Sequence, residues 1–236
     1  MNGTGVPSEL ELGELELLGY LPRSSNETFL VRVVTGADPM LAVYKPRGGE
    51  TPLWDFPEGT LCAREVAAYL VATELGWPDV PPTLLRDGPR GPGSVQLFVP
   101  FDPAEHYFTL AERFPDTFRR VALFDVITNN ADRKAGHCLL GEDGRVWVVD
   151  HGVCFAAEPK LRTVIWDFEG EPVPGALRDD LRRLGAALEG GLGTRLGGLL
   201  SPPEVRALRG RVERTASADR FPAPSGIDRP FPWPPI

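Results

Sequence analysis

The sequence predicts an α+β fold in two lobes, with a β-rich first half and a mostly helical second half. Apolar and polar residues alternate in short runs before residue 99, as they do in half-buried strands. Beyond residue 100 the longer apolar segments follow helical spacing instead. A hairpin within residues 130–155 carries acidic residues beside both of its strands. We therefore predict an N-lobe over residues 1–99 and a C-lobe over residues 100–236.

Composition and net charge exclude several classes of function. The chain has 236 residues, of which 42% are hydrophobic and 25% charged, as in a folded soluble protein. Its net charge of −8 weighs against nucleic-acid binding and stable membrane association. The N-terminus lacks the features of a signal peptide, and no apolar run approaches the ~18 residues of a membrane span. We expect a cytoplasmic protein with buried thiols at Cys62, Cys138 and Cys154, and the three histidines argue against a zinc site.

The N-lobe is predicted to contain five strands and one helix. A short helix is the alternative for the first strand, and residues 1–8 are expected to be a loose leader. The glycine- and proline-rich residues 87–93 are predicted to form a turn between the last two strands. The helix ends at Gly76. The predicted strands cover residues 13–20, 28–34, 40–46, 82–86 and 94–99, and the helix covers residues 60–75.

Lys45 ends an otherwise apolar strand, and an ammonium group in such a position is costly to bury unless it is paired. Glu65, in the following helix, is the predicted partner. The alternative is that Lys45 reaches solvent and Glu65 lies on a wet helix face. Between them, residues 47–59 form an irregular insert that contains two large aromatics, Trp54 and Phe56.

Two further segments of the N-lobe suit a nucleotide. The loop that carries Ser24, Ser25 and Asn26 can offer backbone N–H groups and hydroxyls to an anion, although a plain turn is the alternative. We place the nucleotide base beside Gln96, Phe98 and Val99, where a strand stops before proline and leads into a hinge between the lobes. Free backbone groups around Phe98 and Val99 would suit an adenine edge.

The hairpin predicts phosphoryl-transfer chemistry. Asp132 precedes its first strand, Asp150 follows its second, and the cationic Lys134 lies between them. One carboxylate can orient a nucleophile, the ammonium group can neutralise a phosphate, and the other carboxylate can hold Mg²⁺. Asp125 lies on the apolar face of the preceding helix, so we expect it to brace the 129–133 loop rather than to react.

The rest of the C-lobe is predicted from helical patterns and proline content. We predict helices over residues 116–128, 175–189 and 203–216, with a glycine-rich break between the last two. Residues 221–236 form a proline-rich arm that contains Phe231 and Trp233. The arm either packs on the lobe or is a disordered peptide, and the two aromatics favour packing.

Four motifs together resemble the phosphatidylinositol 3-/4-kinase family in its small bacterial form, which is a distant branch of the protein-kinase-like fold. Within that family, the whole chain is similar to an uncharacterised actinobacterial group. The motifs are Val43-Tyr44-Lys45-Pro46, the Arg64–Leu70 helix segment, Asn130-Ala131-Asp132-Arg133 and Val149-Asp150-His151-Gly152. The resemblance covers about residues 13–170. It implies a two-lobed kinase-like fold with a reduced helical C-lobe.

The resemblance also implies roles for individual residues. Lys45 would bind the α- and β-phosphates of ATP with Glu65 as its partner, and Ser24, Ser25 and Asn26 would form the phosphate loop. Asp132 would be the catalytic aspartate and Asp150 the metal-binding aspartate. Lys134 stands where many protein kinases place a lysine on the γ-phosphate, so it would stabilise charge in the transition state.

One position departs from the family. His137 stands where relatives usually carry an asparagine that holds a second Mg²⁺, and imidazole is a poor Mg²⁺ ligand. If His137 is part of the metal site with Asp150, then one ion binds tightly, Mn²⁺ is preferred, or catalysis is weakened.

We expect a phosphotransferase that uses ATP and Mg²⁺ or Mn²⁺ and acts on a hydroxyl of a protein or small molecule rather than a lipid. The alternatives are a nucleotide-binding pseudokinase, which the histidine at position 137 would favour, and a nucleotidyl transferase built on the same scaffold.

Overall fold

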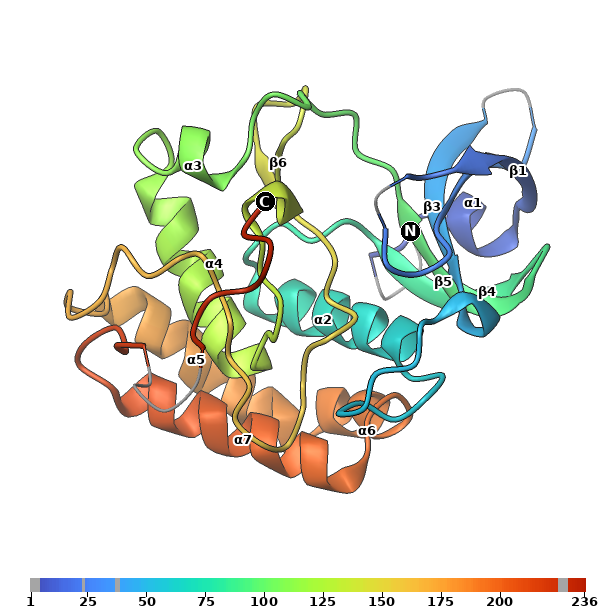
Figure 1. The fold of residues 1–236 in the computed structure, drawn as a ribbon. Helices are drawn as coiled ribbons and strands as arrows, with labels where there is room; N and C mark the ends of the chain where they lie inside the picture. The colour runs from blue at the N-terminus through green and yellow to red at the C-terminus, as the bar shows by residue number, and fades with distance from the viewer. Residues whose placement is uncertain (1–4, 23, 37–38, 225–228) are drawn as a thin grey trace.

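The computed structural model describes residues 5–22, 24–36, 39–224 and 229–236. It has a β-sheet lobe and a helical lobe, which Figure 1 shows on opposite sides of helix α2. The elements of the first lobe are α1 (Ser8–Leu12), β1 (Glu14–Tyr20), β2 (Phe29–Val34), β3 (Met40–Pro46), η1 (Arg47–Gly49), α2 (Leu61–Leu75), β4 (Thr83–Gly88) and β5 (Gly91–Leu97). Those of the second are α3 (Tyr107–Leu110), α4 (Pro115–Thr128), η2 (Ala135–His137), β6 (Cys138–Leu140), β7 (Val146–Val148), α5 (Gly175–Leu188), α6 (Gly191–Gly197) and α7 (Pro202–Ser217).

The five N-lobe strands form one antiparallel sheet in the order β1-β2-β3-β5-β4. The predicted strands are confirmed, including the first, because alternating apolar residues give the sheet a buried face that contains Val31, Ala42, Tyr44 and Val95. Helix α1 lies against the sheet through the fully buried Leu10. The loose leader predicted over residues 1–8 is contradicted at Ser8, where α1 begins, and residues 1–4 lie outside the described part of the chain.

The turn predicted over residues 87–93 is shorter than expected. Strands β4 and β5 stay paired as far as Gly88 and Gly91, so the loop itself contains two residues. Gly91 adopts a φ of +91°, which glycine tolerates best. A Cβ at Gly93 would lie 2.3 Å from the carbonyl oxygen of Lys45. Gly91 therefore lets the hairpin turn tightly, and Gly93 lets β5 approach β3. Composition alone does not distinguish such strand glycines from glycines in a loop.

Helix α2 lies between the two lobes. Nearly all of its residues are buried, and it packs on β4 and β5 as well as on α5 and α6. Arg64 is almost completely buried, where it pairs with Glu204 of α7 and donates to the carbonyl of Cys154 at 2.7 Å. Just beyond α2, the indole of Trp77 donates to Asp180 of α5 at 2.7 Å. One continuous apolar core therefore joins the sheet to the helices.

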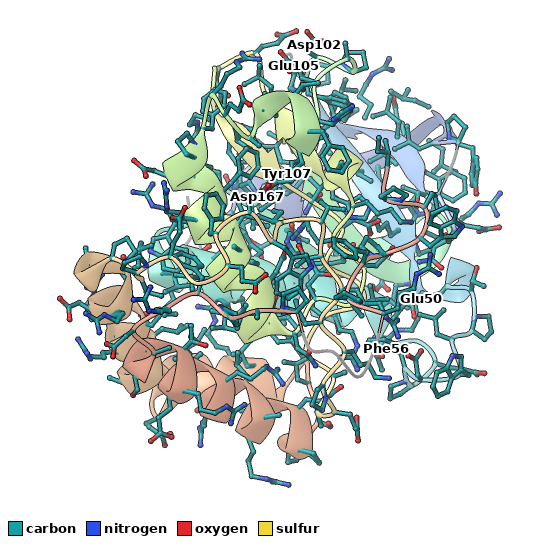
Figure 2. All side chains as sticks on the ribbon, turned by 60° about the vertical axis from the view of Figure 1, so that its left-hand side comes forward. Glu50, Phe56, Asp102, Glu105, Tyr107 and Asp167 are labelled. Atoms are coloured by element: carbon teal, nitrogen blue, oxygen red, sulfur yellow. The ribbon has the colours of Figure 1, made fainter. Side chains whose placement is uncertain are left out.

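The linker after β5 attaches to the hairpin of β6 and β7. The N–H of Asp102 donates to the carbonyl of Leu140, and the N–H of Glu142 donates to that of Pro100, both at 3.1 Å. The short helix α3, which the sequence does not predict, follows the linker. Its Tyr107 packs on α4, and the hydroxyl donates to the carboxylate of Asp167, as Figure 2 shows. These contacts fix the hairpin against α4 and the linker.

The three predicted C-lobe helices are present as α4, α5 and α7, and besides α3 one further helix was missed. The glycine-rich break is in fact helix α6, because Leu192 and Leu196 fall on one face and are buried. The three cysteines are buried and form no disulfide. No helix among the described residues has both the length and the apolar character needed to cross a bilayer.

The C-terminal arm packs back on the lobe, as one of the two alternatives predicts. Within the arm, the carbonyl of Pro230 accepts from the N–H of Thr163 at 3.0 Å, and that of Pro235 accepts from the N–H of Ala135 at 2.8 Å. Figure 1 shows the arm running beside the β6–β7 hairpin. However, Phe231 and Trp233 are 46% and 72% exposed, so these two aromatics do not explain the packing. The arm is held instead by its backbone carbonyls and by Phe221, which is buried against Phe168.

Candidate active site

Strand β3 and helix α2 bring Lys45 and Glu65 together. The Lys45 ammonium donates to Glu65 Oε1 and, at 2.9 Å, to Asp150 Oδ1. Burial lowers the pKa of Lys45, but attraction to Asp150 and Glu65 outweighs it and raises the pKa above its ordinary value. The other oxygen of Glu65 accepts from the N–H of His151 at 2.9 Å. The predicted pair is therefore formed, and it also holds the turn that contains Asp150.

Asp150 follows β7 and has both carboxylate oxygens engaged. Oδ1 accepts from Lys45, and Oδ2 lies 3.3 Å from His137 Nε2. The adjacent ammonium of Lys45 is the main reason that the pKa of Asp150 lies far below its usual range. Its backbone has a φ of +60°, which is uncommon for a residue other than glycine. Asp150 is thus a fixed, ionised carboxylate whose side chain is 49% exposed.

Asp132 and Lys134 lie at the start of the hairpin. Asn130 Oδ1 accepts from the N–H of Asp132 at 3.0 Å, which fixes the loop. The Lys134 ammonium lies 3.2 Å from Asp132 Oδ2. Burial raises the pKa of Asp132 above its ordinary value; the ammonium of Lys134 opposes this shift, and Asp150 adds to it. A carboxylate with a raised pKa is a better proton acceptor than an ordinary aspartate.

A buried network centred on Asp125 supports this loop. Its carboxylate accepts from Asn130 Nδ2 at 3.0 Å, Arg133 Nε at 3.1 Å and Thr163 Oγ1 at 3.1 Å. The bracing role predicted for Asp125 is confirmed. Arg133 continues the network, because it also donates to the carbonyl of Val149 at 2.9 Å. No sequence pattern assigned a role to Arg133 or Thr163, since only the fold brings both of them to the carboxylate of Asp125.

His151 and His137 are both held neutral by their surroundings. Arg133 donates to His151 Nε2 at 2.7 Å, so the proton of that imidazole is on Nδ1. Burial is the largest cause that lowers the pKa of His151, and the charge of Arg133 adds to it. Burial likewise lowers the pKa of His137 to about 4, against an opposing effect of Asp150.

The lowered pKa values of His137 and His151 lead us to expect a loss of stability in mild acid. Both are neutral in the folded protein, but in the unfolded chain they take up protons below the ordinary pKa of 6.5. Each should lower the free energy of unfolding by about 1.4 kcal/mol per pH unit while only the unfolded chain is protonated. Urea midpoints at constant ionic strength should therefore fall between pH 7 and pH 5, and His137→Gln should reduce the slope. Equal midpoints at the two pH values would contradict this account.

The loop predicted to bind phosphate is ordered by contacts of its own. Ser24 Oγ pairs with Thr28 Oγ1 at 2.8 Å, and the carbonyl of Ser25 accepts from Thr51 Oγ1 at 2.6 Å. Asn26 Oδ1 accepts from the N–H of Thr51 at 2.8 Å. In the described part of the chain these side chains make no hydrogen bond to the Lys45–Asp132 cluster, so their binding of phosphate stays a prediction.

The proposed base site needs one correction. The N–H of Phe98 donates to the carbonyl of Leu41 at 3.0 Å, because the pairing of β5 with β3 extends one residue past the strand. It is therefore not free for an adenine edge. Gln96 is buried and donates to Thr83 Oγ1 at 2.8 Å. Within the described residues the N–H of Val99 makes no backbone hydrogen bond, so it stays a candidate.

The carboxylate oxygens of Asp150 suit a metal ion that binds together with a nucleotide. Among the described residues, no three His, Cys, Asp or Glu side chains gather as a ready-made metal centre. Mg²⁺ in phosphate sites uses one or two carboxylates and completes its shell with water and phosphate oxygens. The ionised, half-exposed Asp150 fits such an ion.

A solved structure and the arrangement of the two lobes define the class of fold. The crystal structure of a Helicobacter pylori proinflammatory kinase, CtkA, superposes with a TM-score of 0.51 over 88% of this chain and 93% of that chain, at 12% identity. This likeness confirms the predicted α+β, kinase-like fold. No family model matches the sequence.

Among curated proteins, the chain is 40% identical to Protein Rv2133c of Mycobacterium tuberculosis over 94% of its own length and 92% of that protein. The chain belongs to the family of Protein Rv2133c. It is also 27% identical, over 63% of its length, to phosphatidylinositol 4-kinase gamma 4 of Oryza sativa subsp. japonica. It spans about a third (33%) of that rice protein.

Proposed function

We propose that the protein is a phosphotransferase that moves the γ-phosphoryl group of ATP to a hydroxyl, with distant kinship to the phosphatidylinositol 3-/4-kinases. The observation that carries the proposal is a cluster of two groups, Lys45 with Glu65 and Asp150, and Asp132 with Lys134. His137 links the groups, because it contacts both Asp150 and the N–H of Lys134. A strand of the sheet lobe and both ends of the C-lobe hairpin contribute to the cluster.

The chain's own groups divide the work of transfer. Lys45, held by two carboxylates, presents a fixed positive charge to the α- and β-phosphates. Asp132 orients the acceptor hydroxyl and accepts its proton, for which its raised pKa is suited. Lys134 neutralises charge that develops on the transferred group. A divalent ion at Asp150 would supply further neutralisation of the phosphate oxygens.

The acceptor is proposed to be a protein side chain or small metabolite. The net charge of −8 and the lack of a basic amphipathic segment argue against docking on an anionic lipid surface. A nucleotide-binding protein without transfer activity is the second candidate, because His137 engages an oxygen of Asp150 that a metal ion would otherwise use.

Labelled nucleotides test the proposal. Incubated with Mg²⁺, the protein should transfer label to itself or to water from γ-labelled ATP and not from α-labelled ATP. Lys45→Met should abolish transfer, whereas Lys160→Met, a change of the same kind at a lysine paired with Asp55 outside the cluster, should retain it.

The outcomes separate the candidate functions. Transfer from α-labelled ATP would identify a nucleotidyl transferase. Thermal stabilisation by ATP without transfer of either label would identify a non-catalytic nucleotide-binding protein. A melting temperature that does not respond to ATP would refute both the proposal and this second candidate.

A further inference from the structure

The short turn η2 places His137 beside the N–H of Lys134 and the carboxylate of Asp150. These two contacts determine which ring nitrogen of His137 carries the proton. The backbone N–H of Lys134 points at His137 Nδ1 at 3.3 Å. A backbone N–H can only donate, so Nδ1 is the acceptor and carries no proton. In a neutral imidazole the proton is then on Nε2, which lies 3.3 Å from Asp150 Oδ2. His137 therefore places a protonated nitrogen, and not a lone pair, beside the carboxylate of Asp150.

This arrangement removes both ring nitrogens from metal coordination. The lone pair of Nδ1 is directed at Lys134, and Nε2 carries a proton. If Nε2 bound a metal ion, the proton would have to move to Nδ1, where it would face the N–H of Lys134. Two donors would then oppose each other in a partly buried site, where a donor without an acceptor is costly.

The same contacts fix the carboxylate from both sides. Lys45 holds Oδ1 and His137 holds Oδ2, while the N–H of His151, next along the chain, is held by Glu65. Each carboxylate oxygen keeps a further lone pair, and the side chain of Asp150 is half-exposed. These lone pairs are available to one cation, which would meet oxygen donors alone.

We propose that His137 is a positioning residue for Asp150 and not a metal ligand, and that the site consequently binds one divalent ion. This inference rests on the proposed function for the presence of the ion, but the role of His137 is defined by the protein itself. It also removes the reason to expect a preference for Mn²⁺, because such a preference would come from a nitrogen ligand.

Two measurements test the inference. Long-range ¹H–¹⁵N spectra of histidine-labelled protein, without nucleotide or metal, should show His137 as the Nε2–H tautomer, and Asp150→Asn should shift its resonances. Equilibrium dialysis of Mn²⁺ with protein and a non-hydrolysable ATP analogue, corrected for the nucleotide alone, should give one ion per chain. His137→Asn, which supplies an amide oxygen, should give two, and His137→Ala should still give one.

The Nδ1–H tautomer, or two ions in the natural protein that fall to one in His137→Ala, would overturn the inference. A protein that binds no nucleotide in the dialysis would refute the proposed function instead. The tautomer measurement would then still decide the role of His137.

Discussion

Asp132→Asn is expected to reduce phosphoryl transfer by about 10²- to 10⁴-fold while nucleotide binding is retained, because the amide cannot accept the proton of the acceptor hydroxyl. The substitution preserves the shape of the side chain and leaves the backbone contact between Asp132 and Asn130 in place. The fold should therefore be unaffected. Single-turnover transfer from γ-labelled ATP measures the effect.

Asp143→Asn is the matched control for Asp132→Asn. Asp143 belongs to the same hairpin, but its carboxylate pairs with Arg145 at the turn between β6 and β7. This variant should keep normal transfer. If Asp132→Asn also turned over at the normal rate, with unchanged stabilisation by ATP, Asp132 could not be the proton acceptor.

Asp125→Ala is expected to lower the free energy of unfolding by about 3–5 kcal/mol, because it leaves the guanidinium of Arg133 buried without its counter-charge. Both side chains of this pair are completely buried, and Arg133 Nη2 lies 3.0 Å from Asp125 Oδ1. Asn130 and Thr163 would lose an acceptor as well. Urea denaturation followed by circular dichroism gives the loss directly.

Asp116→Ala tests whether the effect is specific to the buried network. Asp116 lies on the same helix and also pairs with an arginine, Arg119 at 3.0 Å, but its side chain is 87% exposed. An exposed pair contributes about 0–1 kcal/mol. Should Asp125→Ala be too unstable to purify, Asp125→Asn keeps one acceptor and should give an intermediate loss. A loss for Asp125→Ala as small as that for Asp116→Ala would show that the buried pair does not brace the loop.

Local patterns were enough to predict much of the fold and the central pair of the site. Alternation predicted the strands because one face of the sheet is buried, and an ammonium at the end of an apolar strand predicted a carboxylate partner for Lys45. The prediction of Asp125 as a brace was confirmed for the same reason: an acid on the apolar face of a helix requires buried donors.

The features that were missed depend on packing, strand pairing or hydrogen-bond direction, none of which a residue pattern shows. The helicity of α6 comes from packing of Leu192 and Leu196, which outweighs a glycine-rich sequence. The N–H of Phe98 is engaged because the pairing of β5 with β3 runs one residue beyond Leu97, where β5 ends. The protonation of His137 depends on the direction of a single backbone N–H, which no residue pattern reveals.

The position of α2 has a consequence for how the two lobes can move. Helix α2 belongs to the first lobe by sequence, yet Arg64 and the adjoining Trp77 hold it to α7 and α5. A swing of this helix away from Lys45 would break the buried ion pair of Arg64 with Glu204 and expose apolar side chains of α2. The contact between Lys45 and Glu65 is therefore a fixed part of the folded state. Regulation of this protein by movement of α2 away from β3 would lower the free energy of unfolding.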